Sequence, residues 1–373
     1  EARQFTTEIG SEWFFCLEAA SGLNFQESLD NLLDRYDGMQ QEAGLGSDTE
    51  VLLRFHLSDI SNQAKQLKQV LCDREGVRFS SMIGQPPSSG SKVAMEAYHI
   101  HANRPITKET LGDANLLIKH GDYQSIWVKS RPLHPDSSYR QTHELFNHLS
   151  KQLGVQGGSL KDDTIRTWIY VRDVDNNYQD FVDARRELFD LLGMFRGGHY
   201  ISSTGIEGHS AKVSDMVSMD SLSIFGLHSA QIEFLSAPAY LCPTHDYNVT
   251  FERGTRVVYK DRAHYYISGT ASIDYQGNVL HVGNVEKQAE RILINIQALL
   301  EDKGSALDDL QYLVIYLRDS SDWQRIQDFL YANLPKQIPH IIVQGAVCRP
   351  LWLIEMEGIA ASIIGNDRFR LFC

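Results

Sequence analysis

The sequence predicts an α+β fold in which three copies of one ββαβαβ unit pack round a pseudo-threefold axis. A short apolar strand ending in Asp occurs three times, at residues 53–59, 168–173 and 314–319. An amphipathic helical pattern precedes and follows each of these strands. Each unit then ends in a Gly-containing turn and a strand that carries an acid, namely Glu96, Asp220 or Glu357. Repeated units of this kind bury their apolar faces against one another, so three copies predict a compact pseudo-trimer.

The spacing of the repeats defines three expected modules, at residues 1–112, 113–227 and 228–373. Each has an ordinary domain size. The interval between the second and third Asp-ended strands is longer than that between the first and second. We therefore expect an insertion between the second and third repeats, at residues 226–262.

The helices and strands of the first two repeats follow from apolar spacing of three and four residues and from short apolar runs. The first repeat contains a helical face, a strand at 51–57 and a helix at 61–71; the face is formed by Leu29, Leu32, Leu33, Tyr36 and Met39. In the second repeat the first helical face is Leu145, Phe146, Leu149 and Leu153. A strand at 165–171 and a helix from Tyr178 to Leu192 follow it.

The third repeat has the clearest pattern. A β-rich run at 265–273, a turn at 274–278 and a short run at 279–282 predict a hairpin. A helix is expected from Glu286, ending near Gly304. The remaining elements are a strand at 312–318, a helix around Trp323 to Leu330, and strands near 340–347 and 351–360.

Bulk composition excludes several classes of function. The net charge of −13 disfavours nonspecific nucleic-acid binding, which depends on Lys and Arg contacts to phosphates. No apolar run is long enough for a membrane span, and the first residues carry no signal-peptide pattern. The 5 cysteines form no CxxC motif and the 14 histidines form no HExxH motif. We therefore expect a cytoplasmic protein with no metal.

The third repeat resembles the RidA/YjgF family over nearly its whole length. The matching stretches are Ser268-Gly269-Thr270, Gln288 with its following helix, Tyr316-Leu317-Arg318-Asp319, and Ile354 to Ala360. That family forms homotrimers of a chorismate-mutase-like fold with ligand sites between subunits. The resemblance implies that this chain builds the trimer-like core alone, as a monomer or with further self-association.

Residues 160–360 also resemble the chorismatases, which join a RidA-like C-terminal module to a diverged N-terminal half. The stretches that carry this resemblance are 178–185, 203–206, Ser236-Ala237 with Tyr240, 251–253, 269–273 and, above all, 348–357. Chorismatases hydrolyse the enol ether of chorismate and release pyruvate without a metal or cofactor. The resemblance therefore implies a small anionic cyclic or aromatic carboxylate as the ligand.

The sequence also departs from both families. RidA deaminases bind a substrate carboxylate through an Arg on the strand before the last motif, whereas this chain has His340-Ile341-Ile342-Val343 there. This absence disfavours an imine deaminase. The Gly-Arg of the chorismatases is Ala184-Arg185 here, and Glu233-Phe234-Leu235 stands where those enzymes have Arg-Gln. These differences leave the identity of the substrate open.

Glu355 is the candidate catalytic residue. Cleavage of an enol-pyruvyl ether needs a proton donor, and a carboxyl held protonated by burial or by a neighbouring carboxylate can serve. When the closing strands are aligned, Glu357 coincides with Glu96 and Asp220, whereas Glu355 coincides with Ala94 and Ser218. Because the acid at Glu357 recurs in all three units, we expect it to have a structural role. Because the acid at Glu355 occurs in only one unit, we expect it to belong to an active site. The alternative interpretation is that both carboxylates face solvent at a sheet edge.

The resemblance implies eight substrate-binding candidates: Arg185, Tyr240, Arg253, Gly269, Thr270, Ala271, Cys348 and Arg349. Guanidinium groups suit carboxylates, although a single Arg can equally form a surface salt bridge. Tyr240 is equally well explained as a loop anchor, and Cys348 as a small buried filler rather than a nucleophile. Gly269, Thr270 and Ala271 are expected to line the pocket or to form a strand bulge.

The sequence thus predicts hydrolysis of an enol-pyruvyl ether with release of pyruvate and a hydroxybenzoate or a dihydroxycyclohexadiene carboxylate. The alternatives are a non-catalytic RidA-like protein that binds a small metabolite and, with less support, an imine or enamine deaminase. The site is expected between the second and third repeats.

Overall fold

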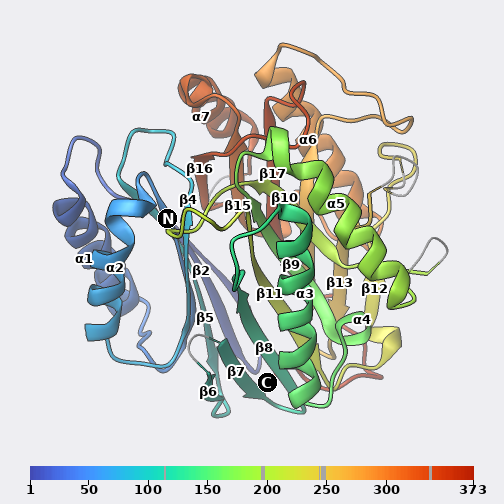
Figure 1. The fold of residues 1–373 in the computed structure, drawn as a ribbon. Coiled ribbons are helices and arrows are strands. Elements are labelled where there is room, and N and C mark those ends of the chain that lie inside the picture. Colours follow the sequence, from blue (N-terminus) through green and yellow to red (C-terminus); the bar gives the residue numbers. More distant parts are fainter. Residues whose placement is uncertain (113–114, 195–197, 243, 245–248, 336–337) are drawn as a thin grey trace.

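The computed structural model describes residues 1–112, 115–194, 198–242, 244, 249–335 and 338–373. It contains three mixed sheets, one for each repeat, and Figure 1 shows them meeting at the centre with helices on the outside. The predicted α+β fold of three RidA-like modules is confirmed. Within the described residues, no helix has both the length and the apolar character that crossing a bilayer requires.

The first module has a five-stranded sheet in the order β1-β2-β5-β3-β4. Its elements are β1 (Ala2–Thr7), β2 (Gly10–Glu18), α1 (Phe25–Glu42), β3 (Glu50–Leu57), α2 (Ile60–Asp73), β4 (Phe79–Gly84) and β5 (Val93–Ala102). Helix α1 begins at a capping box in which Asn24 and Glu27 each bond the other's backbone N–H. Its apolar face packs on the sheet through Leu29, Leu32 and Leu33.

The second module has a six-stranded sheet in the order β10-β9-β11-β8-β7-β6. Its elements are β6 (Thr107–Leu111), β7 (Asn115–His120), β8 (Tyr123–Ser130), α3 (Ser138–Val155), α4 (Leu160–Asp163), β9 (Thr164–Val171), α5 (Val174–Leu191), β10 (Ser202–Glu207) and β11 (Val217–Phe225). Because β6 pairs with β7, this strand belongs to the second sheet, although the expected boundary after residue 112 assigned it to the first module.

The third module has a six-stranded sheet in the order β12-β13-β14-β17-β15-β16. Its elements are β12 (Ile232–Phe234), β13 (Gly254–Val258), β14 (Ala263–Ala271), α6 (Val285–Glu301), β15 (Leu310–Leu317), α7 (Trp323–Asn333), β16 (His340–Gln344) and β17 (Ile354–Ser362). The expected partner run at 279–282 forms only one isolated bridge, between Ile273 and Val279. The true hairpin partner of β14 is β13, which lies inside the expected insertion.

Each module closes with two strands rather than the one of the predicted ββαβαβ unit. The first of the two pairs in parallel with the Asp-ended strand, as β4 does with β3, β10 with β9 and β16 with β15. The second lies antiparallel on the other side of that strand. The Asp residues themselves lie at helix N-caps: the Asp59 and Asp319 side chains accept bonds from the N–H of Asn62 and Ser321. Asp173 occupies the N-cap of α5 but makes no side-chain capping bond, so capping explains two of the three recurring Asp residues.

The recurring acids lie at equivalent register positions and connect the modules. Glu96 lies opposite Arg54, Asp220 opposite Trp168 and Glu357 opposite Val314. Two of these acids pair with a buried arginine of another module: Asp220 with Arg54 at 3.4 Å, and Glu357 with Arg166. These contacts join the second module to the first and to the third within one chain.

Candidate active site

A cavity of about 420 Å³ lies between the second and third modules, within the usual range for small-molecule sites. Helix α5 and strand β10 supply one wall, and β14, β17 and the segment after β16 supply the other. Val249, Phe251 and Arg253, which precede β13, complete the lining. The lining side chains that matter below are Tyr178, Arg185, Phe251, Arg253, Gly269, Ala271, Cys348, Arg349, Trp352 and Glu355.

A β-bulge in β14 forms the floor of the cavity. The register between β14 and β17 shifts between Ile267 and Thr270, so the expected bulge at Gly269 is present. The Gly269 N–H donates to Thr204 Oγ1 on β10 at 2.8 Å, which joins the bulge to the second module. A Cβ at Gly269 would collide with the Glu355 carboxyl, so only glycine leaves this carboxyl its place.

Glu355 lies at the start of β17, between Ala271 of β14 and Tyr316 of β15. It is 6% exposed and lines the cavity. Burial raises the pKa of Glu355 to about 8, and the neighbouring Glu357 carboxylate adds to the rise, while Arg166 and Arg253 oppose it. A carboxyl with this pKa is mostly protonated at neutral pH and can donate a proton.

Glu357 lies two residues further along β17 and has a full set of partners. Arg166 of β9 pairs with its Oε2, and the Thr204 hydroxyl donates to the same oxygen. The Tyr316 hydroxyl donates to Oε1 at 2.8 Å. Both oxygens of this buried side chain therefore have donors, and one of the donors is the Arg166 guanidinium.

The three arginines expected from the sequence all line the cavity, and Arg186 of α5 lines it as well. Arg185 Nε donates to Thr250 Oγ1 at 3.1 Å, and its guanidinium lies 4.7 Å from the centre of the Phe181 ring. Arg253 Nη2 donates to the Cys242 carbonyl at 3.0 Å. The Arg349 guanidinium lies 5.0 Å from the Trp352 ring. The lining therefore combines cations with aromatic faces, which suits a planar or cyclic anion.

Cys348 lines the cavity as a thiol. Burial raises the pKa of Cys348 to about 12, and the nearby Glu355 adds to the rise. The hydroxyl of Tyr178 on α5 hydrogen-bonds this thiol. A thiolate is therefore nearly absent at neutral pH, which agrees with the expectation that Cys348 is not a nucleophile.

Two candidates do not line the cavity. Tyr240 is 42% exposed, and its ring stacks on the guanidinium of Arg291 on α6 at 5.8 Å. Thr270 is fully buried and donates to the Ser268 carbonyl at 2.9 Å. Tyr240 is therefore a loop anchor, and Thr270 holds the bulge. The lining residues Tyr178, Phe251 and Trp352 belong to the motifs that carry the chorismatase resemblance, so those motifs contained a signal for them.

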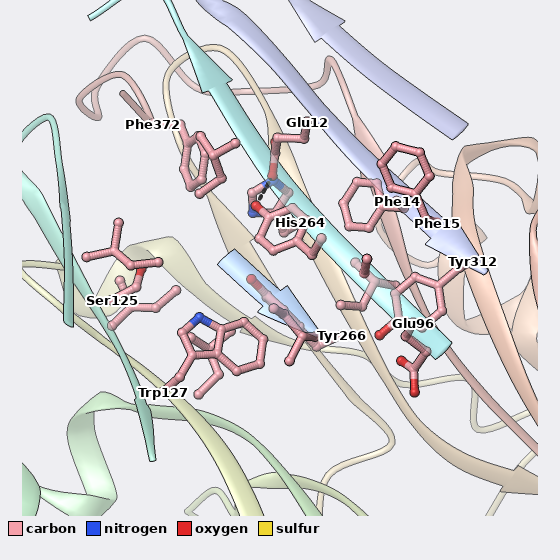
Figure 2. Close-up of a pocket in the computed structure, with 18 residues that line it drawn as sticks. Glu12, Phe14, Phe15, Glu96, Ser125, Trp127, His264, Tyr266, Tyr312 and Phe372 are labelled. Carbon is pink, nitrogen blue, oxygen red and sulfur yellow. Dashed lines mark hydrogen bonds and ion pairs between the residues drawn. The ribbon is translucent and has the colours of Figure 1, made fainter. Parts of the chain in front are cut away.

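A second cavity, of about 40 Å³, lies among the three sheets and is shown in Figure 2. Its walls are mainly apolar, with Phe14, Trp127 and Phe372 among them. Glu12 of β2 lies at its edge and pairs with Arg262 at 2.5 Å and with His264 Nε2 at 2.9 Å. This volume has room for water-sized molecules only. Within the described residues, no three His, Cys, Asp or Glu side chains group as metal ligands would.

Comparisons with known proteins agree with this architecture. The family model described as endoribonuclease L-PSP matches residues 255–362, which is the third module. The 3-aminoacrylate deaminase RutC of Acinetobacter baylyi is 31% identical over 96 residues, covering 26% of this chain and 76% of that protein. A crystal structure of a chorismatase aligns with a TM-score of 0.67 and 18% identity, covering 95% of this chain and 100% of that chain. This last likeness extends the shared fold to all three modules.

Proposed function

The chain belongs to the endoribonuclease L-PSP family, and we propose that it is a cofactor-independent enzyme of chorismatase type. It hydrolyses the enol-pyruvyl ether of chorismate, or of a related cyclic carboxylate, and releases pyruvate. The observation that carries the proposal is Glu355, a buried carboxyl with a pKa raised to about 8 by desolvation and by Glu357. It faces a cavity of about 420 Å³ that four arginines also line.

Proton donation by Glu355 begins the reaction. The carboxyl O–H bond breaks, and the proton adds to the terminal methylene carbon of the enol ether, whose π electrons form the new C–H bond. The adjacent carbon becomes an oxocarbenium centre, and the carboxylate left on Glu355 stabilises this positive charge. Because the charge develops only along the reaction path, a carboxyl that is neutral in the resting enzyme stabilises the transition state more than the ground state.

Water completes the hydrolysis. It adds to the oxocarbenium carbon and loses a proton, giving a hemiketal. Collapse of the hemiketal breaks its bond to the ring oxygen, which takes a proton and leaves as the ring alcohol. One water is consumed, and the products are pyruvate and a dihydroxycyclohexadiene carboxylate. Formation of a hydroxybenzoate instead consumes no net water, because ring aromatisation accompanies the loss of pyruvate.

The arginines orient the substrate in this proposal. An enol-pyruvyl ether of a cyclic acid carries two carboxylates, and Arg185, Arg253 and Arg349 offer guanidinium groups at three places on the wall. Bidentate pairing of guanidinium with carboxylate fixes both position and orientation. Local cations thus attract an anion to a chain whose net charge is −13. Trp352 and Phe251 supply apolar faces for the ring.

Deamination of an imine is the second candidate, favoured by the 31% identity to the deaminase RutC. Strand β16 counts against it, because residues His340 to Val343 contain no Arg to hold a substrate carboxylate. Binding of a small carboxylate without turnover is a third outcome. The cavity would then hold its ligand through the same arginines while Glu355 serves only as a hydrogen-bond donor.

The test is incubation with chorismate and coupled detection of pyruvate. We expect wild-type protein to release pyruvate, and Glu355→Gln to lower the rate by about 10²–10⁴-fold, the usual contribution of a general acid. Glu290→Gln is the matched control, since Glu290 is an exposed glutamate on α6. Equal turnover by wild type and Glu355→Gln would overturn the proposal. Calorimetry with aromatic carboxylates, and ammonia release from an imine, then decide between the other two functions.

A further inference from the structure

Arg166 is a buried cation at the interface of the second and third modules. It lies on β9 and is 1% exposed. Its Nη2 pairs with Glu357 and donates to Thr204 Oγ1, and its Nη1 donates to the Thr167 carbonyl at 3.2 Å. The Trp168 ring lies 5.0 Å from the guanidinium. These contacts fix the side chain with its charge directed at the third module.

The other two modules have no cation at the equivalent position. Arg166 lies opposite Leu222, two residues after the recurring acid of its module. The same register position holds Leu52 in the first module and Tyr312 in the third. Of these three equivalent positions, only the one at the cavity interface holds a cation, just as only the third copy of the closing strand holds an acid at the position of Glu355.

The recurring acid also keeps a partner at an equivalent place. Tyr316 bonds Glu357, and at the same register position in the first module His56 Nε2 bonds Glu96 Oε1 at 2.9 Å. Glu96 thus has the same type of surroundings as Glu357. It differs in having Ala94, not a second acid, two residues earlier on its strand. The carboxylate at the position of Glu357 thus recurs in the first module, whereas the second carboxyl, Glu355, occurs only in the third.

We propose that Glu357, through its ion pair with Arg166, is the positioning residue of the site and assigns the proton of the carboxyl pair to Glu355. This inference rests on the proposed function, because the proton is the one that the reaction consumes. Successive side chains of a strand point to opposite faces of the sheet, so the carboxyls of Glu355 and Glu357, two residues apart, lie on the same face. Two buried carboxyls this close do not both ionise readily, and the one with donors on both oxygens keeps the charge.

The groups around Glu355 show why Glu357 decides the outcome. Besides burial, the Glu357 charge is the larger influence on the pKa of Glu355, ahead of the opposing charges of Arg166 and Arg253. Charged or titratable residues face the cavity or Glu355 from every element around it: Tyr178 and Arg185 of α5, Arg166 of β9, Arg253, Cys348, Arg349, and Glu357 of β17. Asp183 of α5 also lines the cavity and pairs with Arg186 at 2.5 Å. Of these two paired anions, Glu357 is the one that raises the pKa of Glu355.

Carboxyl-¹³C NMR of glutamate-labelled protein tests the inference. In wild type we expect one resonance that titrates near pH 8 and that disappears in Glu355→Gln. In Glu357→Gln this titration moves down by at least about one pH unit, because a like charge is removed and Arg166 is left unopposed. Glu96→Gln is the matched control: it removes the equivalent carboxylate of the first module and leaves the Glu355 titration in place.

A second variant covers the possibility that Glu357→Gln does not fold. The pair Arg166→Met with Glu357→Leu replaces the buried ion pair by apolar side chains, an exchange that proteins often tolerate. The Glu355 titration again moves down, by less than in Glu357→Gln, since the weaker opposing charge is lost too. A titration that stays near pH 8 in the folded variant would overturn the inference. If no pyruvate is released, the titrations still decide this point, so the two proposals fail separately.

Discussion

Two buried glutamates of this molecule have opposite ionisation states. Glu12, at the small central cavity of Figure 2, is fully buried and pairs with Arg262, His264 and the Tyr98 hydroxyl. Burial disfavours its charge, but His264 and Arg262 outweigh burial and lower its pKa to about 2. Glu355, at the larger cavity, is also buried, yet its pKa rises to about 8.

The difference shows that burial alone does not make a reactive carboxyl. Every strong contact of Glu12 favours the carboxylate, so this group holds modules one and three together and has no proton to donate. Glu355 has an anionic neighbour and faces space large enough for a ligand. The partners of each side chain therefore decide whether a buried glutamate has a lowered or a raised pKa. Each of the following variants tests one side of that distinction.

The largest effect is expected at the paired carboxylate. Glu12→Gln leaves Arg262 buried without its main counter-charge, which destabilises the fold by about 3–5 kcal/mol. Chemical denaturation followed by circular dichroism measures this. Glu1→Gln, at an exposed glutamate, is the control and should leave the unfolding midpoint in place. A loss below about 1 kcal/mol, the size of an exposed pair, would show that Glu12 is not a structural carboxylate.

Glu355→Gln should stabilise the fold at alkaline pH. The folded-state pKa of Glu355 is about 8, above the usual value of 4.5, so the folded protein binds this proton more tightly than the unfolded chain. The stability linked to this proton is complete below about pH 4.5 and is lost as pH rises toward 8. At pH 9 we expect the variant to gain about 2–4 kcal/mol relative to wild type.

The measurement is the free energy of unfolding at pH 5, 7 and 9 for both proteins. The difference between them should grow as pH rises and level off above pH 8. A difference that is independent of pH would mean that Glu355 ionises like an exposed glutamate. For Glu12 we expect the reverse dependence on pH. Because the folded-state pKa of Glu12 is lowered, the free energy of unfolding should fall as pH drops from about 4.5 to about 2.

Gly269→Ala tests the placement of the Glu355 carboxyl. The new Cβ would contact the carboxyl and lie 3.1 Å from Thr204 Cγ2, so Glu355 must rotate. Misplacement of a reacting group by about 1 Å can cost on the order of 100-fold in rate, and we expect a loss of about 10–100-fold in kcat. Gly154→Ala is the control, because nothing lies within 4 Å of a Cβ there. Equal kcat in the two variants would contradict the geometry.

The smallest effect is expected at Tyr240, which stacks on Arg291 outside the cavity. Tyr240→Phe keeps the ring, so kcat and KM should stay within about twofold, while exposed ring contacts of this kind contribute at most about 1 kcal/mol. Tyr178→Phe is the matched comparison, since it removes the hydroxyl that bonds Cys348 in the cavity wall. If Tyr240→Phe raised KM more than Tyr178→Phe did, the cavity would not be the substrate site.

Local patterns were enough to predict most of the elements. Apolar spacing located α3, α5 and α6, and the repeated Asp identified the start of the helices that follow β3, β9 and β15. Pairing between strands was less predictable, because it depends on residues far apart in the chain. The run at 279–282 looks like a partner for β14, yet β13 takes that place. Strand β6 likewise joins the sheet that follows it.

The residues of the candidate site show the same contrast between what local sequence patterns predict and what depends on contacts between distant residues. Glu355 emerged because alignment of the repeats shows that only one copy has an acid there, and that comparison needs no structure. The direction of a loop side chain has no such signal, so the sequence left Tyr240 open between a ligand contact and a loop anchor. The contribution of Arg166 depends on contact across a module interface, 191 positions along the chain from Glu357, and no local pattern reveals it.

Difference infrared spectroscopy tests the central claim most directly. The spectrum of wild type minus Glu355→Gln, recorded at pH 6 and at pH 9.5, reports whether this carboxyl carries a proton. We predict a protonated carboxyl C=O band at pH 6 that is replaced by carboxylate bands at pH 9.5, as a pKa of about 8 requires. Wild type minus Glu12→Gln should show only carboxylate bands at both pH values. Carboxylate bands for Glu355 at pH 6 would contradict the account.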